Sequence, residues 1–206
     1  MLKYLITIPY ILGFKILPYE FEEKVIKYSL CDSIDERIAT MVHDVFDDYN
    51  SLGFNTIALT NDTFYDVIPI CNEYMSRDKY GYARFINKGY YVDRKIFISN
   101  YILDLEYNLW NVLYHEILHT VGLGHSTEEG LMKYVVTLNT NYEVIPDTER
   151  VYPSTDDIEG LEFLYGWIDD DIINDDINSD PKDKLERKNN NKKIIKKLYK
   201  LCMSLE

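Results

Sequence analysis

Three histidines near the middle of the chain constrain its fold more than any other feature. Residues 115–126 read His-Glu-Ile-Leu-His-Thr-Val-Gly-Leu-Gly-His-Ser. Because positions four apart share one face of an α-helix, His115 and His119 can direct their imidazoles at one metal ion. Gly122 can end the helix in the left-handed conformation and turn the chain sharply. The spacing therefore predicts a helix, a turn at Gly122, and His125 returning as a third ligand.

The donor set indicates what kind of site this is. Three neutral histidines leave a zinc ion with its full positive charge and an open fourth position, which is typical of a catalytic site. Glu116 lies beside His115 and can take a proton from an activated water and pass it to a leaving amine. We therefore predict one catalytic Zn²⁺ with Glu116 as general base. A zinc-stabilised binding module is the alternative, although a purely structural site has no use for that carboxylate.

The rest of the chain predicts one α+β domain, since 206 residues are too few for two comfortable ones. The first helix is expected to be capped by Asp32 or Ser33 and to end at Gly53, and the second to run from about Leu105 to Val121. A third helix is expected to start at Ser154 or Thr155 and to reach Tyr165. The β-rich segments are 23–30, 54–59, 65–71, 82–86 and 95–99.

The predicted domain spans residues 23–168 and is flanked by two segments of different composition. Residues 1–22 include an apolar stretch from Tyr4 to Phe14, which is either the core of a cleaved signal peptide (residues 1–17) or part of an N-terminal extension. Residues 169–206 read as an acidic linker followed by a basic, partly helical tail. Contact of that tail with a membrane surface stays open beside the simpler prediction of a solvated helix.

Charge and cysteine content exclude several kinds of protein. The formal charge is −13, and residues 1–168 carry the whole excess, which should repel nucleic acid. The cysteines Cys31, Cys71 and Cys202 lie far apart and match no C-x-x-C pattern. They therefore indicate neither a cysteine zinc site nor a disulfide framework. No run of about 18 apolar residues, which an ordinary membrane-spanning helix would need, is present.

The wider motif resembles a known family. H-E-x-x-H-x-x-G-x-x-H is the metzincin signature, and Ser126 directly after the third histidine resembles the matrixins, the matrix metalloproteinase group. Gly130-Leu131-Met132 falls where a matrixin has its Met-turn, and residues 154–166 resemble the helix that closes a matrixin catalytic domain. The resemblance covers about residues 24–168. It implies a metzincin, or zincin-like, catalytic domain with a twisted, mixed five-stranded sheet, a long active-site helix and a C-terminal helix.

The resemblance also implies roles for individual residues. Met132 would form a hydrophobic floor beneath the three imidazoles, unless it is one more core methionine. Asp157 would anchor the Met-turn, unless it simply caps its helix. An extended substrate would align along an edge strand that contains Tyr82, Ala83, Arg84 and Phe85. The implied partner is a protein or peptide substrate, and the implied location is extracellular. We expect a monomer.

The chain also departs from the family pattern. Residues 72–95 contain no histidine, so the structural zinc that matrixins usually bind there is not expected. Asp93 falls near the position of a family calcium ligand, but the surrounding motif is poorly kept, which leaves calcium open. Cys31 is not in the Pro-Arg-Cys-Gly context of an inhibitory propeptide, so the sequence shows no means of latency.

Overall fold

The computed structural model describes residues 15–17, 25–54, 56–61, 67–76, 79–87, 92–127 and 129–165. All of them belong to one compact unit, Tyr10–Trp167. The predicted acidic linker and basic tail, and the apolar stretch from Tyr4 to Phe14, lie outside the described residues. Within the described part of the chain, no helix is long and apolar enough to cross a membrane.

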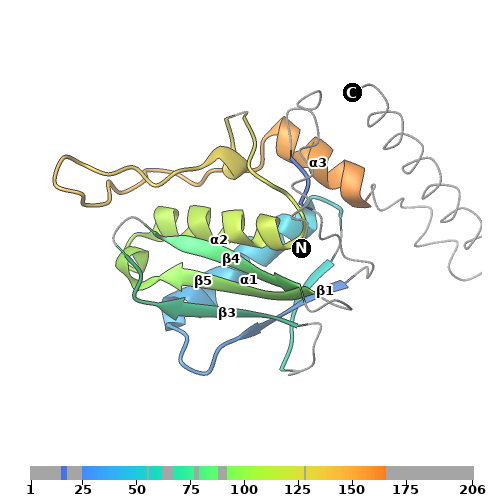
Figure 1. The fold of residues 1–206 in the computed structure, drawn as a ribbon, viewed down its shortest axis with the longest axis horizontal. Helices are drawn as coiled ribbons and strands as arrows, with labels where there is room; N and C mark the ends of the chain where they lie inside the picture. Colours follow the sequence, from blue (N-terminus) through green and yellow to red (C-terminus); the bar gives the residue numbers. More distant parts are fainter. Residues whose placement is uncertain are drawn as a thin grey trace, which may run out of the picture. The chain divides into compact units, whose positions relative to one another are not determined.

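Five strands form one mixed sheet in the order β2-β1-β3-β5-β4. Their bounds are β1 (Val25–Leu30), β2 (Thr56–Leu59), β3 (Val67–Glu73), β4 (Gly81–Asn87) and β5 (Val92–Ser99). Every neighbouring pair is parallel except β4 and β5, which are antiparallel, so β4 is an antiparallel edge strand. The predicted mixed five-stranded sheet is confirmed (Figure 1).

Three α-helices accompany the sheet, as predicted: α1 (Glu36–Ser51), α2 (Glu106–Thr120) and α3 (Thr155–Tyr165). The 3₁₀ turns η1 (Asn100–Ile102) and η2 (Leu131–Lys133) flank α2. The predicted cap of α1 was wrong, because the side chain of Asp35, and not Asp32 or Ser33, accepts the amide of Arg37. A turn closed by the amide of Ile34 and the carbonyl of Cys31 uses the earlier residues.

The core lies between the sheet and the two long helices, which also contact each other. Alternate residues of the central strands, such as Tyr28, Ile70 and Ile96, are fully buried. α2 is buried around most of its circumference, from Asn108 through Leu118. A helix enclosed on all sides is held rigidly by its neighbours, so functional side chains on α2 start from a fixed position.

Cys31 and Cys71 form a disulfide, which corrects the prediction that the cysteines make no such framework. The two residues are 40 positions apart in sequence, but their Cα atoms are 5.1 Å apart. The parallel register of β1 and β3 pairs Leu30 with Ile70, which places the next residue of each strand side by side. That register cannot be read from cysteine spacing alone.

Candidate metal centre and catalytic cleft

α2 and the loop after it bring three imidazoles together. His115, His119 and His125 each offer a ring nitrogen, and these nitrogens all lie within 4.8 Å of one another. The Nε2 atoms of His119 and His125 are 3.2 Å apart. Two nitrogens bound to a tetrahedral zinc at about 2.05 Å would be separated by roughly 3.3 Å. The donor set and its spacing therefore fit one zinc ion.

The turn that returns His125 is built as the sequence predicts. Gly122 has φ of 111°, in the region that favours glycine. Its amide bonds to the carbonyl of His119, and the amide of Leu123 bonds to the carbonyl of Leu118, each at 3.0 Å. These two bonds make a Schellman motif, which ends α2 while satisfying its last carbonyls.

Hydrogen bonds fix the tautomers of two histidines. The Nδ1 atom of His115 donates to the carbonyl of Leu131 at 2.7 Å, and that of His119 donates to the carbonyl of Leu123 at 2.8 Å. A carbonyl can only accept, so each Nδ1 must carry the proton. In a neutral imidazole Nε2 is then a bare acceptor, which is the form that binds metal.

Burial keeps these imidazoles neutral. It lowers the pKa of His115 to about 4 and, with the neighbouring His115, the pKa of His119 to about 3. Burial and the charge of Lys15 lower the pKa of His125 as well. All three imidazoles are therefore uncharged near pH 7, so a metal ion need not displace the second ring proton of an imidazolium there.

Glu116 lies beside this centre with one carboxylate oxygen unsatisfied. The side chain is buried, the amide of Ala83 donates to it, and its Oε2 atom has no hydrogen-bond partner among the described residues. Burial raises its pKa to about 8. A buried carboxylate oxygen without a partner is costly, and such atoms recur where a protein performs chemistry.

Gly81, which was not among the predicted site residues, lets α2 approach β4 closely enough to place Glu116 there. A Cβ atom at Gly81 would lie 2.5 Å from Cγ1 of Val112 and 3.1 Å from Oε1 of Glu116. No side chain fits in that space. A glycine at the start of a β-rich segment can mark such a close approach, and this is the signal that could have identified it.

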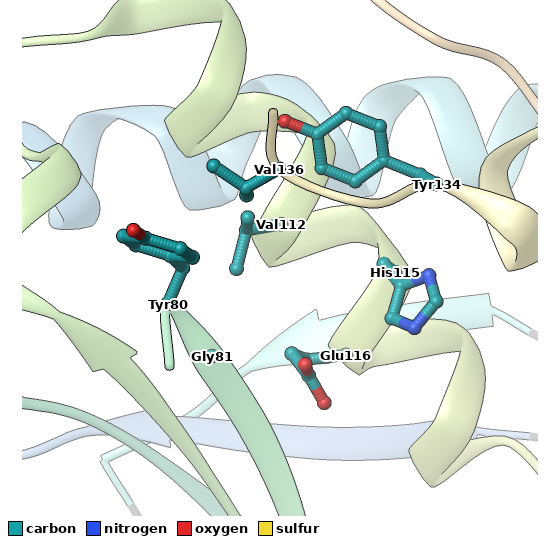
Figure 2. A pocket seen from close by; sticks show the side chains of 7 residues that line it. All are labelled: Tyr80, Gly81, Val112, His115, Glu116, Tyr134 and Val136. Atoms are coloured by element: carbon teal, nitrogen blue, oxygen red, sulfur yellow. The ribbon is translucent and has the colours of Figure 1, made fainter. Parts of the chain in front are cut away.

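A small cavity adjoins Glu116 and His115 (Figure 2). Its volume is about 130 Å³, and its lining includes the side chains of Tyr80, Val112 and Val136. Figure 2 shows Glu116 and His115 on the α2 side, while Tyr134 and Val136 come from the segment after η2. A cavity of about 150 Å³ accommodates benzene, so this one has room for one side chain of moderate size.

Residues 133–152, the segment that supplies Tyr134 and Val136 to this cavity, are hydrogen-bonded to two buried asparagine side chains of α2. Asn111 donates to Asp147 at 2.8 Å and accepts the amide of Val151 at 2.7 Å. Asn108 accepts the amide of Asp147 at 3.0 Å, and the hydroxyl of Tyr134 donates to the same aspartate at 2.5 Å. Sequence reasoning missed these residues, because asparagine in an amphipathic helix gives no sign of its partner.

The predicted Met-turn occupies η2 and is joined to α3. The amide of Met132 donates to Asp157 at 3.3 Å, and the amide of Ser154 donates to the same oxygen at 2.8 Å. Ser126 donates its amide to the carbonyl of Met132 at 3.1 Å and its hydroxyl to Asp156. Asp157 thus contacts both the Met-turn and the residue that precedes its own helix. Met132 is fully buried, and its role as a floor beneath the imidazoles stays a prediction.

The main chain of residues 15–17 lies against the loop that leads to His125. The amide of Leu17 donates to the carbonyl of Gly122 at 2.7 Å, and the amide of Gly124 donates to the carbonyl of Lys15 at 2.6 Å. Ile16 and Leu123 form an antiparallel bridge. This segment, within the predicted N-terminal extension, therefore braces the turn that carries the third histidine.

The predicted substrate strand, Tyr82 to Phe85, lies in β4 at the edge of the sheet. The amide of Ser99 donates to the carbonyl of Tyr80, which identifies 80 and 99 as a hydrogen-bonded pair. Such pairs recur every second residue of an antiparallel ladder. The main-chain groups of Gly81, Ala83 and Phe85 therefore face away from β5, on the side where Ala83 reaches Glu116.

Comparison with known proteins agrees with this geometry. Residues 26–166 match the matrixin family of peptidases. A 61-residue segment is 39% identical to the interstitial collagenase of Sus scrofa, covering 30% of this chain and 11% of the collagenase. A 60-residue segment is 40% identical to matrix metalloproteinase-18 of Xenopus laevis, covering 29% of this chain and 12% of that protein. The matched segments thus span only about a tenth of these relatives.

The match covers more than two thirds of the chain and includes every residue of the centre described above. Catalytic zinc is the cofactor of this family, and the three imidazoles form a group able to hold it. The chain belongs to the matrixin family of zinc metalloendopeptidases.

Proposed function

We propose that this protein is a zinc-dependent endopeptidase in which His115, His119 and His125 hold the metal and Glu116 is the general base. The observation that carries the proposal is the meeting of bare imidazole nitrogens with a buried, partly unsatisfied carboxylate at an open sheet edge. When bound, zinc would polarise the scissile carbonyl and make a water easier to deprotonate.

Glu116 supplies the proton transfer in this proposal. The positive charge of a bound metal would lower the pKa of this buried carboxyl and favour its ionised form. Its Oε2 atom can then accept the proton of the attacking water, since no described group is hydrogen-bonded to it. The amide of Ala83 holds the carboxylate in place. The same carboxyl group then donates that proton to the amine that leaves, which returns Glu116 to its starting state.

The edge of β4 positions the substrate. An extended peptide can pair with the outward-facing groups of Gly81 and with the carbonyl of Ala83, and so become an additional strand. The cavity beside Glu116 then receives one apolar side chain of that peptide. Because β4 continues from Gly81 at the cavity to Asn87, a paired peptide extends well beyond the residue in the cavity, which favours cleavage within a chain over removal of a terminal residue.

An extracellular location is part of the proposal. The Cys31–Cys71 disulfide fits an oxidising compartment, and disulfides are rare in the reducing cytosol. Collagen is not proposed as the substrate, since the similarity to collagenases is limited to about 11% of their length.

Cleavage of a quenched fluorescent peptide with both ends blocked tests the proposal. The full chain should cleave it, lose activity in a zinc chelator, and recover it when zinc, but not magnesium, is added back. Blocked ends exclude an exopeptidase. Cleavage that persists in the chelator, or a purified chain that neither binds zinc nor cleaves any peptide, would contradict the assignment.

A further inference from the structure

Positive charge is concentrated in the segment that contains β4, although residues 1–168 as a whole are acidic. Residues 77–95 contain six of the thirteen basic side chains in residues 1–168, but only two acidic ones. The whole of residues 1–168 carries the excess of thirteen negative charges. An acidic peptide would therefore be repelled by most of residues 1–168 and attracted by this one segment of them.

The register of β4 and β5 places part of this charge on one face of the sheet. Tyr82 pairs with Phe97 and Arg84 pairs with Lys95, so these four side chains point to the same side. Ile96 and Ile98 point to the other side, into the core shared with the helices. We call Lys79, Tyr82, Arg84, Lys95 and Phe97 the cationic outer face.

Aromatic rings hold these cations. Tyr82 and Phe97 are stacked with their centroids 4.8 Å apart. Arg84 and Lys95 lie 5.3 Å and 4.9 Å from the centroid of Phe97, and Lys79 lies 4.4 Å from that of Tyr82. A ring orients a cation but does not neutralise its charge, so these groups keep their attraction for anions.

The acidic side chains on this face leave that charge available. Glu73 accepts a hydrogen bond from the hydroxyl of Tyr82 at 3.1 Å. Asp93 pairs with Ile86, two cross-strand pairs beyond Arg84 and Lys95. Within the described part of the chain, no ion pair involves Lys79, Arg84 or Lys95. Arg84 is exposed at the edge, where a neighbouring strand would lie.

Strand geometry connects this face to the substrate. In a peptide paired with β4, successive side chains point to opposite faces of the extended sheet. Residues on the inner face lie on the side of the cavity and Glu116, while their neighbours lie beside Tyr82 and Arg84. We propose, building on the peptidase function above, that the cationic outer face selects substrates with acidic side chains at the outward-facing positions.

The expected size of this charge preference follows from the solvent exposure of the basic side chains. One solvent-exposed ion pair changes an equilibrium by roughly 1.5- to 5-fold, and salt weakens it. Two acidic side chains that meet Arg84 and its neighbours should therefore raise kcat/KM by about five- to tenfold at low ionic strength. The advantage should largely vanish in about 1 M salt, where the screening length falls to roughly 3 Å.

Matched peptides test this selection. The two peptides of a pair differ only in whether glutamate or glutamine occupies the positions one and three residues from the residue that fills the cavity. One pair carries these residues on the N-terminal side of the cavity-filling residue, and a second pair carries them on its C-terminal side. The kcat/KM of the glutamate peptide, divided by that of the glutamine peptide, should be about threefold lower in Arg84→Gln than in the unaltered protein. Lys27→Gln is the control, since Lys27 is on the same face but three strands away, at roughly 14 Å. Its ratio should equal that of the unaltered protein.

The outcomes separate the two proposals. Equal cleavage of the glutamate and glutamine peptides by the unaltered protein would overturn acid selection and leave the peptidase assignment standing. A ratio that falls equally in Lys27→Gln and Arg84→Gln would also overturn it, because net charge alone would then explain the preference. If neither peptide is cleaved by the zinc-loaded protein, the peptidase assignment fails and acid selection fails with it.

Discussion

The Nδ1 atom of His115 donates to the carbonyl of Leu131 at 2.7 Å, which joins the first histidine of the centre to the Met-turn. The next residue, Met132, donates its amide to Asp157 in α3. Through Asp157, which is 25 residues beyond Met132 in sequence, α3 therefore helps to hold the carbonyl that orients the imidazole of His115. Groups that orient a metal-binding histidine commonly change metal affinity when they are removed.

Asp157→Ala should accordingly weaken zinc binding without touching a histidine. The substitution leaves the amides of Met132 and Ser154 without their acceptor, which should lower the free energy of unfolding by about 2 kcal/mol. Once the Met-turn is no longer held by Asp157, the Leu131 carbonyl that orients His115 is less fixed, and zinc affinity should fall roughly 10- to 100-fold. Zinc competition with a chromophoric chelator and urea unfolding measure the two effects. Glu159→Ala, an exposed change in the same helix, should alter neither.

Gly81→Ala should reduce catalysis more than stability. The added methyl group would meet Val112 at 2.5 Å and the Glu116 carboxylate at 3.1 Å, so β4 and α2 must separate or Glu116 must move. A misplacement of about 1 Å can cost roughly 100-fold in rate. We expect kcat to fall at least tenfold while zinc content is retained. An unchanged kcat would mean that the position of Glu116 does not depend on this contact.

The cap of α1 predicts a specific dependence of stability on pH. Hydrogen bonds from the side chain and amide of Arg37 lower the pKa of Asp35 from 3.8 to about 2. The folded state therefore favours the ionised carboxylate, whose contribution is present above pH 3.8 and is lost as the pH falls towards 2. In zinc-free protein, Asp35→Ala should cost about 1 kcal/mol at pH 7 and much less at pH 2. Urea unfolding at both pH values checks the difference, and an equal cost at both would contradict it.

Reduction of the Cys31–Cys71 disulfide should destabilise the domain. The bond closes a loop of 40 residues, for which chain entropy gives roughly 4 kcal/mol. Thermal unfolding with and without a reductant measures the loss, and Cys31→Ser with Cys71→Ser should reproduce it. A melting temperature that reductant leaves unchanged, in protein that contains no free thiol beforehand, would contradict the prediction.

The sequence was most informative where residues close together in the chain act together. The histidine motif, the end of α2 at Gly122 and the positions of the helices follow from local spacing and capping rules, and the structure contains each of them. The resemblance to matrixins also singled out Met132 and Asp157, which are hydrogen-bonded to each other, while the roles it implies for them stay predictions.

Features that depend on long-range register could not be predicted. The disulfide needs the pairing of β1 with β3, and the importance of Gly81 needs the approach of α2 to β4. The cap of α1 was misplaced because three residues near one another could each accept an amide, and only the turn at Cys31 excludes two of them. The contact of residues 15–17 with the loop before His125 had no signal in either segment alone.

The most direct test of the central claim compares the unaltered protein with Glu116→Gln at equal zinc content. The substitution keeps the size of the side chain and removes its ability to accept a proton, so kcat/KM for a blocked peptide should fall by about 100-fold or more while one zinc per chain is retained. Equal cleavage by the two proteins would contradict the account, since proton transfer by Glu116 would then play no part in the reaction.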